Sequence, residues 1–256
     1  MAQAKGELHG KRALVTAGAA GIGRAIAEAL AGAGASVWVC DVDSSALASC
    51  PPGWIATRCD VGHEQEVDAL FAELEARWGG LDILVNNAGI AGPTAGIEEV
   101  SPADWRRTID VNLNSMFYCT RRAVPWLKRA RGVIVNLASV AGRLGYAFRT
   151  PYAASKWAVV GLSHSLAKEL GPDGVRVNAI LPGIVAGPRI DAVFRARAEA
   201  LDQPVEEIER AYLEKVSLRT KVTAQDVAAM ALFLCGPGGE RVSGQAISVD
   251  GNVEQI

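Results

Sequence analysis

The sequence contains few of the residues that bind metals or build disulfide frameworks. Its 256 residues include three histidines and five cysteines. The histidines lie far apart in the chain without a ligand-like spacing, which argues against a metal site. The cysteines form no C-x-x-C pair, and an odd number of them cannot all form disulfides. Because the first residues, MAQAKGELHGKR, also lack the apolar segment of a secretion signal, we expect a reduced, cytoplasmic protein without a metal.

The sequence also lacks an excess of charge of one sign and any long apolar run. The 26 basic and 28 acidic residues give a net charge of −2, so no global field would attract nucleic acid or an anionic membrane. One basic cluster, RRAVPWLKRAR (121–131), is typical of a solvated helix C-terminus, and a nucleic-acid patch is the alternative. Charge, Gly or Pro interrupts each apolar stretch before it could span a bilayer. We expect neither nucleic acid nor a membrane as a partner.

The chain instead shows a regular alternation of short apolar runs and longer helical patterns. Unbroken Val/Ile/Leu runs indicate strands that are covered on both faces, as in a parallel sheet. The predicted strands are 12–16, 35–40, 54–58, 81–86, 132–139, 175–181 and 245–250, and the predicted helices are 22–34, 64–78, 103–129 and 151–171. This order predicts an α/β fold with one domain, 1–256, built as a doubly wound (Rossmann-like) parallel sheet with helices on both faces.

One segment interrupts this alternation. Residues 182–221 separate the last two predicted strands and are far longer than a usual connection between a strand and a helix. Long insertions at the carboxyl edge of a sheet are commonly lids. We predict a substrate lid at about 187–217, and an additional pair of surface helices is the alternative.

A glycine-rich loop, VTAGAAGIG (15–23), joins the first predicted strand to the first helix. Its glycines, Gly18, Gly21 and Gly23, are ordered G-x-x-G-x-G rather than G-x-G-x-x-G, the dinucleotide fingerprint. Free N–H groups at the helix N-terminus would still favour a pyrophosphate. The second strand leads into Asp41, whose carboxylate can accept hydrogen bonds from both ribose hydroxyls and would repel a 2′-phosphate. This pattern favours NAD over NADP; a structural turn with an unrelated aspartate is the alternative.

A tyrosine and a lysine lie four residues apart at the start of a predicted helix, in TPYAASKWAV. At this spacing the side chains of Tyr152 and Lys156 project from one face, with their Cβ atoms about 5–6 Å apart. A cation so close to a phenol favours the phenolate, so the pair can transfer protons near neutral pH. For the pair alone, an ordinary surface contact is the alternative.

Further motifs give the sequence a specific resemblance. The strand 132–139 ends in Ser139, the strand 81–86 continues into an N-N-A-G motif at 86–89, Asn112 lies in DVNLNS, and a Pro-Gly pair follows at 182–183. Together with the loop and the Y-x-x-x-K motif, these residues resemble the short-chain dehydrogenase/reductase family over nearly the whole chain. The family loop, T-G-x-x-x-G-x-G, is matched by residues 16–23 with Ala17 in place of the first glycine. The glycine order is therefore that of the family.

The resemblance implies a role for each catalytic candidate. Tyr152 would be the general acid–base, Lys156 would favour its phenolate and bind the nicotinamide ribose, and Ser139 would orient the reacting oxygen. Asn112 would hold a water that relays protons from Lys156. Considered singly, Asn112 could be a polar residue inside a helix and Ser139 a cap at the end of a strand.

The resemblance also implies how NAD and a second copy of the chain would bind. Asp60 and Val61 would meet the adenine, and Val185 would bind the carboxamide through its backbone, although Gly187 replaces a frequent threonine of the family. The full set of expected cofactor contacts is Gly18, Ala20, Gly21, Ile22, Gly23, Asp41, Asp60, Val61, Asn87, Ala88, Gly89, Tyr152, Lys156 and Val185. Family members of this kind form homotetramers, which would pair helix faces near 101–129 and 152–170.

These motifs indicate an NAD-dependent oxidoreductase that interconverts a secondary alcohol, or a sugar hydroxyl, and a ketone or lactone. Arg149 and Arg189 flank the expected substrate end, and guanidinium groups bind carboxylate, sulfonate or phosphate oxygens in pairs. The two arginines favour a small polar substrate, for example an anionic derivative of a sugar or polyol. The alternative is that Arg149 is solvated or pairs with an acid of a neighbouring subunit. Two other functions stay open: a 3-oxoacyl thioester reductase, and a catalytically silent scaffold that senses nucleotides.

Overall fold

The protein is built around one parallel sheet. The computed structural model describes residues 6–253, and the sheet within them has the strand order β3-β2-β1-β4-β5-β6-β7, with every pair parallel. The strands are β1 (Arg12–Thr16), β2 (Ser36–Asp41), β3 (Ile55–Arg58), β4 (Ile83–Asn86), β5 (Val133–Leu137), β6 (Arg176–Pro182) and β7 (Ala246–Val249). The strand order reverses direction between β1 and β4, which is where doubly wound sheets bind ligands. The predicted fold class is confirmed.

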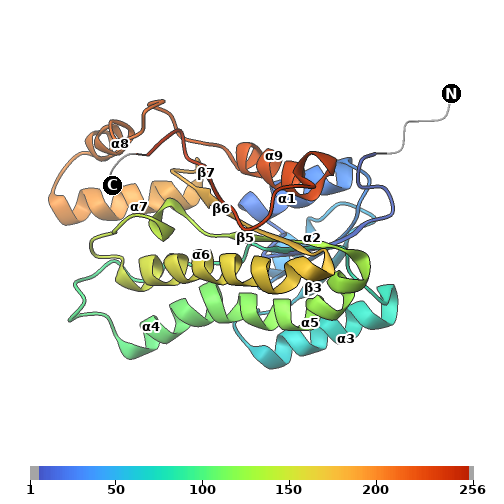
Figure 1. The fold of residues 1–256 in the computed structure, drawn as a ribbon. Helices are drawn as coiled ribbons and strands as arrows, with labels where there is room; N and C mark the ends of the chain where they lie inside the picture. The colour runs from blue at the N-terminus through green and yellow to red at the C-terminus, as the bar shows by residue number, and fades with distance from the viewer. Residues whose placement is uncertain (1–5, 254–256) are drawn as a thin grey trace.

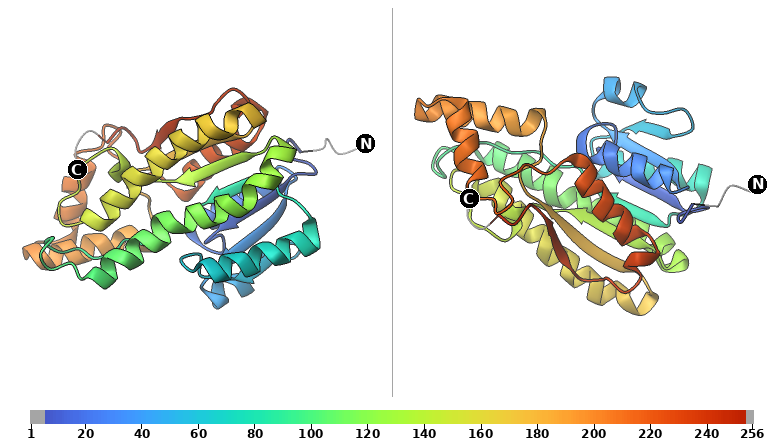
Figure 2. Two further views of the ribbon diagram at one scale, coloured as in Figure 1. Left: turned by 60° about the horizontal axis from the view of Figure 1, so that its bottom comes forward. Right: turned by 90° about the horizontal axis from the view of Figure 1, so that it is seen from above.

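Helices cover both faces of this sheet (Figure 1). One face carries α1 and α9, and the other carries α3, α5 and α6, as the two turned views also show (Figure 2). The helices are α1 (Gly21–Gly32), α2 (Ser44–Ala48), α3 (Glu64–Trp78), α4 (Pro102–Ile109), α5 (Ser115–Ala130), α6 (Thr150–Leu170), α7 (Pro188–Leu201), α8 (Val205–Leu213) and α9 (Ala224–Cys235).

Coverage on both faces explains why the strands are apolar at successive positions. In β1, Ala13 and Val15 belong to a core cluster with α1 and α9, whereas Leu14 belongs to a second cluster with α3 and α5. Neighbouring side chains of a strand point to opposite faces, so each residue of β1 after Arg12 is buried. No helix among the described residues is both long enough and apolar enough to cross a bilayer.

The structure differs from the predicted helices in two places. The pattern at 103–129 is divided into α4 and α5 by a π-helical turn, Asp110–Asn114, a feature that often accompanies functional sites. Helix α9 was not predicted, although it begins with a capping box. Thr223 accepts a hydrogen bond from the Asp226 N–H, and the Asp226 carboxylate accepts one from the Thr223 N–H. This reciprocal pair is a sequence-level signal of a helix start.

The long insertion forms the helix pair α7 and α8. Both views place this pair at the end of the molecule opposite the N-terminus (Figures 1 and 2). Its inner side forms an apolar cluster in which Phe194 and Tyr212 pack with Val140 and Ile184. Val140 directly follows Ser139 in the chain, so the helix pair contacts the expected substrate end.

Candidate active site

The glycine-rich loop is fastened to the end of β4 by two polar side chains. Thr16 Oγ1 accepts hydrogen bonds from the N–H groups of Asn87 (2.9 Å) and Ala88 (3.0 Å). In return, Asn87 Nδ2 donates to the carbonyl oxygens of Thr16 (2.9 Å) and Ala17 (3.0 Å). The threonine of the loop and the N-N-A-G motif thus fix each other across the switch point of the sheet.

This loop leaves room for a phosphate group at the N-terminus of α1. A Cβ atom on Gly23 would overlap the Ala17 carbonyl oxygen and Asn87 Nδ2, so only glycine fits there. The N-cap residue of α1, Ala20, provides no side-chain cap, so the first N–H groups of the helix are free for an anion. Ala17 has a φ of +48°, a left-handed conformation that glycine adopts more easily. Its substitution for the family's glycine therefore retains the turn at some cost in strain.

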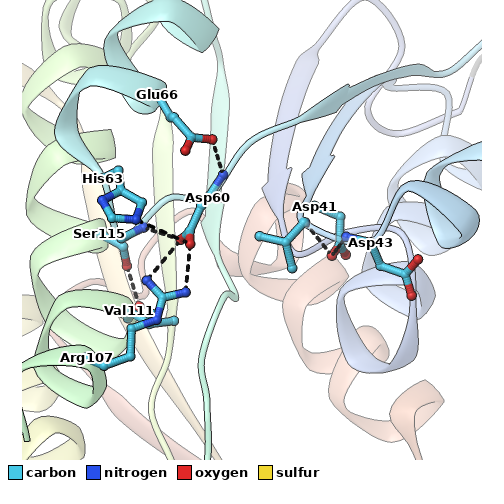
Figure 3. Close-up of polar contacts among 10 residues, drawn as sticks. Asp41, Asp43, Asp60, His63, Glu66, Arg107, Val111 and Ser115 are labelled. Atoms are coloured by element: carbon cyan, nitrogen blue, oxygen red, sulfur yellow. Dashed lines mark hydrogen bonds and ion pairs between the residues drawn. The ribbon is translucent and has the colours of Figure 1, made fainter. Parts of the chain in front are cut away.

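Asp41 is oriented by the backbone that follows it. Its Oδ1 atom accepts hydrogen bonds from the N–H groups of Val42 (2.8 Å) and Asp43 (3.2 Å), as Figure 3 shows in part, while Oδ2 receives a weaker one from Ala19 (3.3 Å). The nearby cation Arg24 is paired with Glu28 at 2.7 Å. Oδ2 accepts only this one weak hydrogen bond and so can still accept others, and Arg24 is already engaged by an acid.

Most of the predicted site residues line a single cavity of about 410 Å³. Those that line it are Ala20, Gly21, Ile22, Gly23, Asp41, Asn87, Gly89, Ser139, Arg149, Tyr152, Lys156, Val185 and Arg189. The other five, which do not belong to its lining, are Gly18, Asp60, Val61, Ala88 and Asn112. The structure therefore brings the expected cofactor loop, the Tyr-Lys pair and both arginines to one place.

Ser139, Tyr152 and Lys156 come from two neighbouring elements of this cavity. Ser139 follows β5 and its Oγ accepts a hydrogen bond from the Ala141 N–H (3.2 Å), so its own hydroxyl proton is free to be donated. Lys156 is buried on α6 and donates to the carbonyl oxygen of Leu137 (2.7 Å). Its Nζ lies 5.8 Å from the centroid of the Tyr152 ring. Burial, with a smaller contribution from the positive charge of Arg189, lowers the pKa of Lys156 to about 7.

Asn112 lies in the π-helical turn and is completely buried. Its Oδ1 accepts a hydrogen bond from the Ile90 N–H (2.7 Å), and its Nδ2 donates to the Ile90 carbonyl oxygen and to Ser155 Oγ (both 3.0 Å). A Cβ on Gly89 would be within 3.4 Å of both Asn112 Oδ1 and Lys156 Nζ. Asn112 therefore joins the segment after β4 to α6 directly beside Lys156, and its role in a proton relay stays a prediction.

Asp60 is held by Arg107 and His63 outside the cavity (Figure 3). Arg107 on α4 donates to its Oδ2 at 2.7 Å, and His63 Nε2 lies 3.7 Å from the same oxygen. Burial raises the pKa of Asp60, but the hydrogen bonds from Arg107 and from the Gly62 N–H outweigh it and keep the pKa below its usual value. Contacts of Asp60 and Val61 with adenine remain predictions.

The substrate end of the cavity contains residues that sequence reasoning did not single out. Tyr146, Ile184 and Val193 line it together with Arg149 and Arg189. Tyr146 could have been predicted from the sequence, because it lies in the same short loop before α6 as Arg149. Val193 belongs to α7, and only the folding of the insertion back onto the sheet brings it there.

A family model described as "Enoyl-(Acyl carrier protein) reductase" matches residues 17–253. The chain belongs to the short-chain dehydrogenase/reductase family. It is 36% identical over 252 residues to the 7alpha-hydroxysteroid dehydrogenase of Escherichia coli K12, covering 95% of this chain and 94% of that protein. It is also 36% identical over 253 residues to the D-beta-hydroxybutyrate dehydrogenase of Cupriavidus necator, with 95% and 98% covered.

A solved structure with a similar fold contains bound NAD+. A structure of NAD+-bound xylitol dehydrogenase superimposes with a TM-score of 0.90 at 26% identity, covering 96% of this chain and 100% of the other. As a member of the short-chain dehydrogenase/reductase family with several dehydrogenase relatives, the protein is an oxidoreductase that acts on CH–OH groups. The predicted family and enzyme class are confirmed.

Proposed function

We propose that this protein is an NAD-dependent dehydrogenase that interconverts a secondary hydroxyl of a small polar substrate and the corresponding ketone or lactone. The observation that carries the proposal is that Asp41 and the set Ser139, Tyr152 and Lys156 line the same cavity. The uncapped N-terminus of α1 between them suits a pyrophosphate. NAD, when bound, supplies the hydride chemistry.

The residues of the chain would manage the proton and the reacting oxygen. The Tyr152 phenolate would take the proton of the substrate hydroxyl during oxidation, and the resulting Tyr152 hydroxyl would return it during reduction. The Ser139 hydroxyl, whose proton is free, would donate a hydrogen bond to the reacting oxygen and polarise it. Lys156, held 2.7 Å from the Leu137 carbonyl oxygen, would bind the ribose and, in its protonated form, place a positive charge beside the phenol ring.

The choice of NAD over NADP rests on Asp41. Its Oδ2 atom can accept from the ribose hydroxyls, whereas a 2′-phosphate in that position would meet a carboxylate. Arg24, which could otherwise compensate that phosphate, is paired with Glu28. The NAD+-bound relative supports this choice.

Three further properties belong to the same proposal. The helix pair α7–α8 would act as a lid, because its apolar cluster contacts Val140 beside Ser139. The protein would form a homotetramer: Phe117 on α5 and Trp157 on α6 are each 52% exposed on the helices that the family pairs, and large exposed apolar side chains favour an interface. The five free cysteines support a reducing, cytoplasmic setting.

Turnover with a panel of alcohols tests the proposal. Purified protein would be incubated with NAD or NADP and with polyols, sugars, hydroxy acids and a 3-hydroxyacyl thioester, and the absorbance of the reduced cofactor would be followed. We expect NAD to be reduced at least ten-fold more efficiently than NADP. Preferential use of NADP with the thioester would favour the acyl thioester reductase, and NAD binding without turnover of any alcohol would favour the silent scaffold.

A further inference from the structure

Arg149 is a buried cation without an acidic partner among the described residues. Its side chain is part of a residue that is 8% exposed, and no acidic side chain among residues 6–253 forms an ion pair with it. Its Nη2 donates to the Ala91 carbonyl oxygen (3.0 Å), while its Nε is buried without any hydrogen-bond partner. Arginine stays charged in proteins, and an unpaired buried charge is costly for the folded state. The fold therefore holds a guanidinium that lacks a counter-ion.

This guanidinium lies beside the reacting group of the proposed mechanism. Its Cζ is 5.1 Å from the centroid of the Tyr152 ring, and Arg149 lines the cavity together with Tyr152. A group bound to Arg149 would therefore lie only a few bonds from the carbon whose hydroxyl meets Tyr152.

The side chains that line the cavity also carry an excess of positive charge. The lining residues include three with basic side chains, Arg149, Lys156 and Arg189, and within the described part of the chain Asp41 is the only acidic one. Asp41 is assigned to the adenosine ribose, so no acid offsets the cations near Tyr152. Oxidised nicotinamide would add a further positive charge. Arg189 is exposed, and its one hydrogen bond, to the Gly89 carbonyl oxygen, is long at 3.3 Å, so it is free to turn toward a ligand.

We propose that Arg149 anchors an oxyanion of the substrate, so that the substrate class is a small hydroxy acid or sugar acid whose carboxylate lies a few bonds from the oxidised carbon. A guanidinium binds a carboxylate with paired, charge-assisted hydrogen bonds, and the described residues engage only the Nη2 atom of Arg149. Arg189, at the start of α7, closes over the same group from the lid. This proposal rests on the proposed dehydrogenase function and specifies its substrate.

The structural alternative, in which Arg149 only braces the loop before α6, makes an opposite prediction for stability. If its bond to Ala91 and its stacking on Tyr152 are its purpose, replacing it lowers the melting temperature. If its purpose is to bind an anion, replacement by a neutral side chain leaves the melting temperature of the cofactor-free protein unchanged or raises it, since an uncompensated buried charge is removed.

The test uses Arg149→Gln, with Arg149→Lys as the variant that keeps the charge. Arg197→Gln is the matched control: Arg197 also stacks on a tyrosine, Tyr212, with its Cζ 5.6 Å from the ring, and donates one hydrogen bond, but it does not line the cavity. Each protein would be assayed with hydroxy acids and sugar acids, and with the neutral methyl ester or parent sugar of each. Binding of propionate and of propionamide to the protein–NADH complex would be measured by NADH fluorescence.

We expect wild-type protein to prefer the acid of each pair and to bind propionate but not propionamide. Arg149→Gln should reduce kcat/KM for the acid about ten-fold to a hundred-fold, as expected for one charged hydrogen bond or more, and should change it little for the neutral partner. Propionate binding should disappear in Arg149→Gln, persist weakly in Arg149→Lys, and be unchanged in Arg197→Gln.

Equal losses on the acid and its neutral partner, or a lowered melting temperature with propionate binding retained, would overturn the proposal. So would a wild-type preference for the neutral compounds. The propionate and melting measurements need no turnover, so they test the anion site even if no alcohol is oxidised. Conversely, oxidation of neutral alcohols with NAD in a protein that does not bind propionate would leave the dehydrogenase proposal standing and remove this one.

Discussion

Replacing Lys156 by methionine should remove a pH dependence from the stability of the protein. Lys156 is 4% exposed, and burial, assisted by Arg189, lowers its pKa from 10.5 to about 7. Between these two pH values the unfolded chain binds more protons than the folded one, so wild-type stability rises with pH over this window. Below pH 7 the lysine is charged in both states, and its burial then opposes folding in full.

The magnitude follows from the two pKa values. At about 1.36 kcal/mol for each pH unit, the difference corresponds to about 5 kcal/mol of destabilisation by the charged form. Methionine has a similar shape and removes this charge, but it leaves the Leu137 carbonyl oxygen without its donor, at a cost of about 1 kcal/mol. We therefore expect the cofactor-free Lys156→Met protein to be about 3–4 kcal/mol more stable than wild type near pH 6 and to have about the same stability as wild type near pH 10.

Urea unfolding of the cofactor-free proteins between about pH 6 and pH 10 measures how the difference in stability between the variant and wild type changes with pH. Lys168→Met provides the control, because Lys168 lies on the same helix but is exposed, and its replacement should have a small effect that does not vary with pH. The reasoning would be refuted if the free energies of unfolding of Lys156→Met and wild type changed in parallel with pH, or if the variant were the less stable protein near pH 6. In either case burial of the charged lysine would not destabilise the folded protein.

Three other changes follow from the site. Gly23→Ala should abolish NAD binding and destabilise the fold by about 1–3 kcal/mol, because the new Cβ overlaps the Ala17 carbonyl oxygen. The control is Gly32→Ala, which should be neutral or stabilising because a Cβ there meets no atom within 4 Å. Equal melting temperatures of the two variants in calorimetry would contradict this. Asp41→Ala should weaken NAD about ten-fold to a hundred-fold and NADP much less, as fluorescence titration would show; unchanged selectivity would remove Asp41 from the ribose site. Light scattering at micromolar concentration should give the mass of a tetramer, and a monomer would refute the proposed assembly.

The sequence was sufficient to predict the fold and the place of most site residues, for physical reasons. Val/Ile/Leu runs predict buried parallel strands. Asn87 and Ser139 were assigned to the site through the resemblance to the family, and they meet Asp41 at one cavity because all three follow the carboxyl ends of strands. The spacing of Tyr152 and Lys156 is set by helix geometry alone. These inferences depend on local pattern and on the sheet, both of which the sequence encodes directly.

Other features of the site depend on tertiary packing and could not be predicted. The burial of Arg149 results from its loop closing against Ala91. The burial of Lys156 results from the packing of α6 on β5, where the Leu137 carbonyl oxygen accepts a hydrogen bond from Lys156 Nζ. Nothing local marks Asp60 as the partner of Arg107, which lies on a distant helix. The π-helical turn around Asn112 could not be predicted either, because the sequence pattern at 103–129 is that of one continuous helix.

The central claim, that Tyr152 transfers the proton in an NAD-dependent oxidation, is tested most directly by Tyr152→Phe. The ring that Arg149 and Lys156 face is retained and only the hydroxyl is lost. With an alcohol that the wild type oxidises, we predict that turnover falls by at least about 10²-fold, the usual range for loss of general acid–base catalysis, while the Kd for NADH by fluorescence stays within a few-fold. Turnover close to that of wild type, with NADH still bound, would contradict the account.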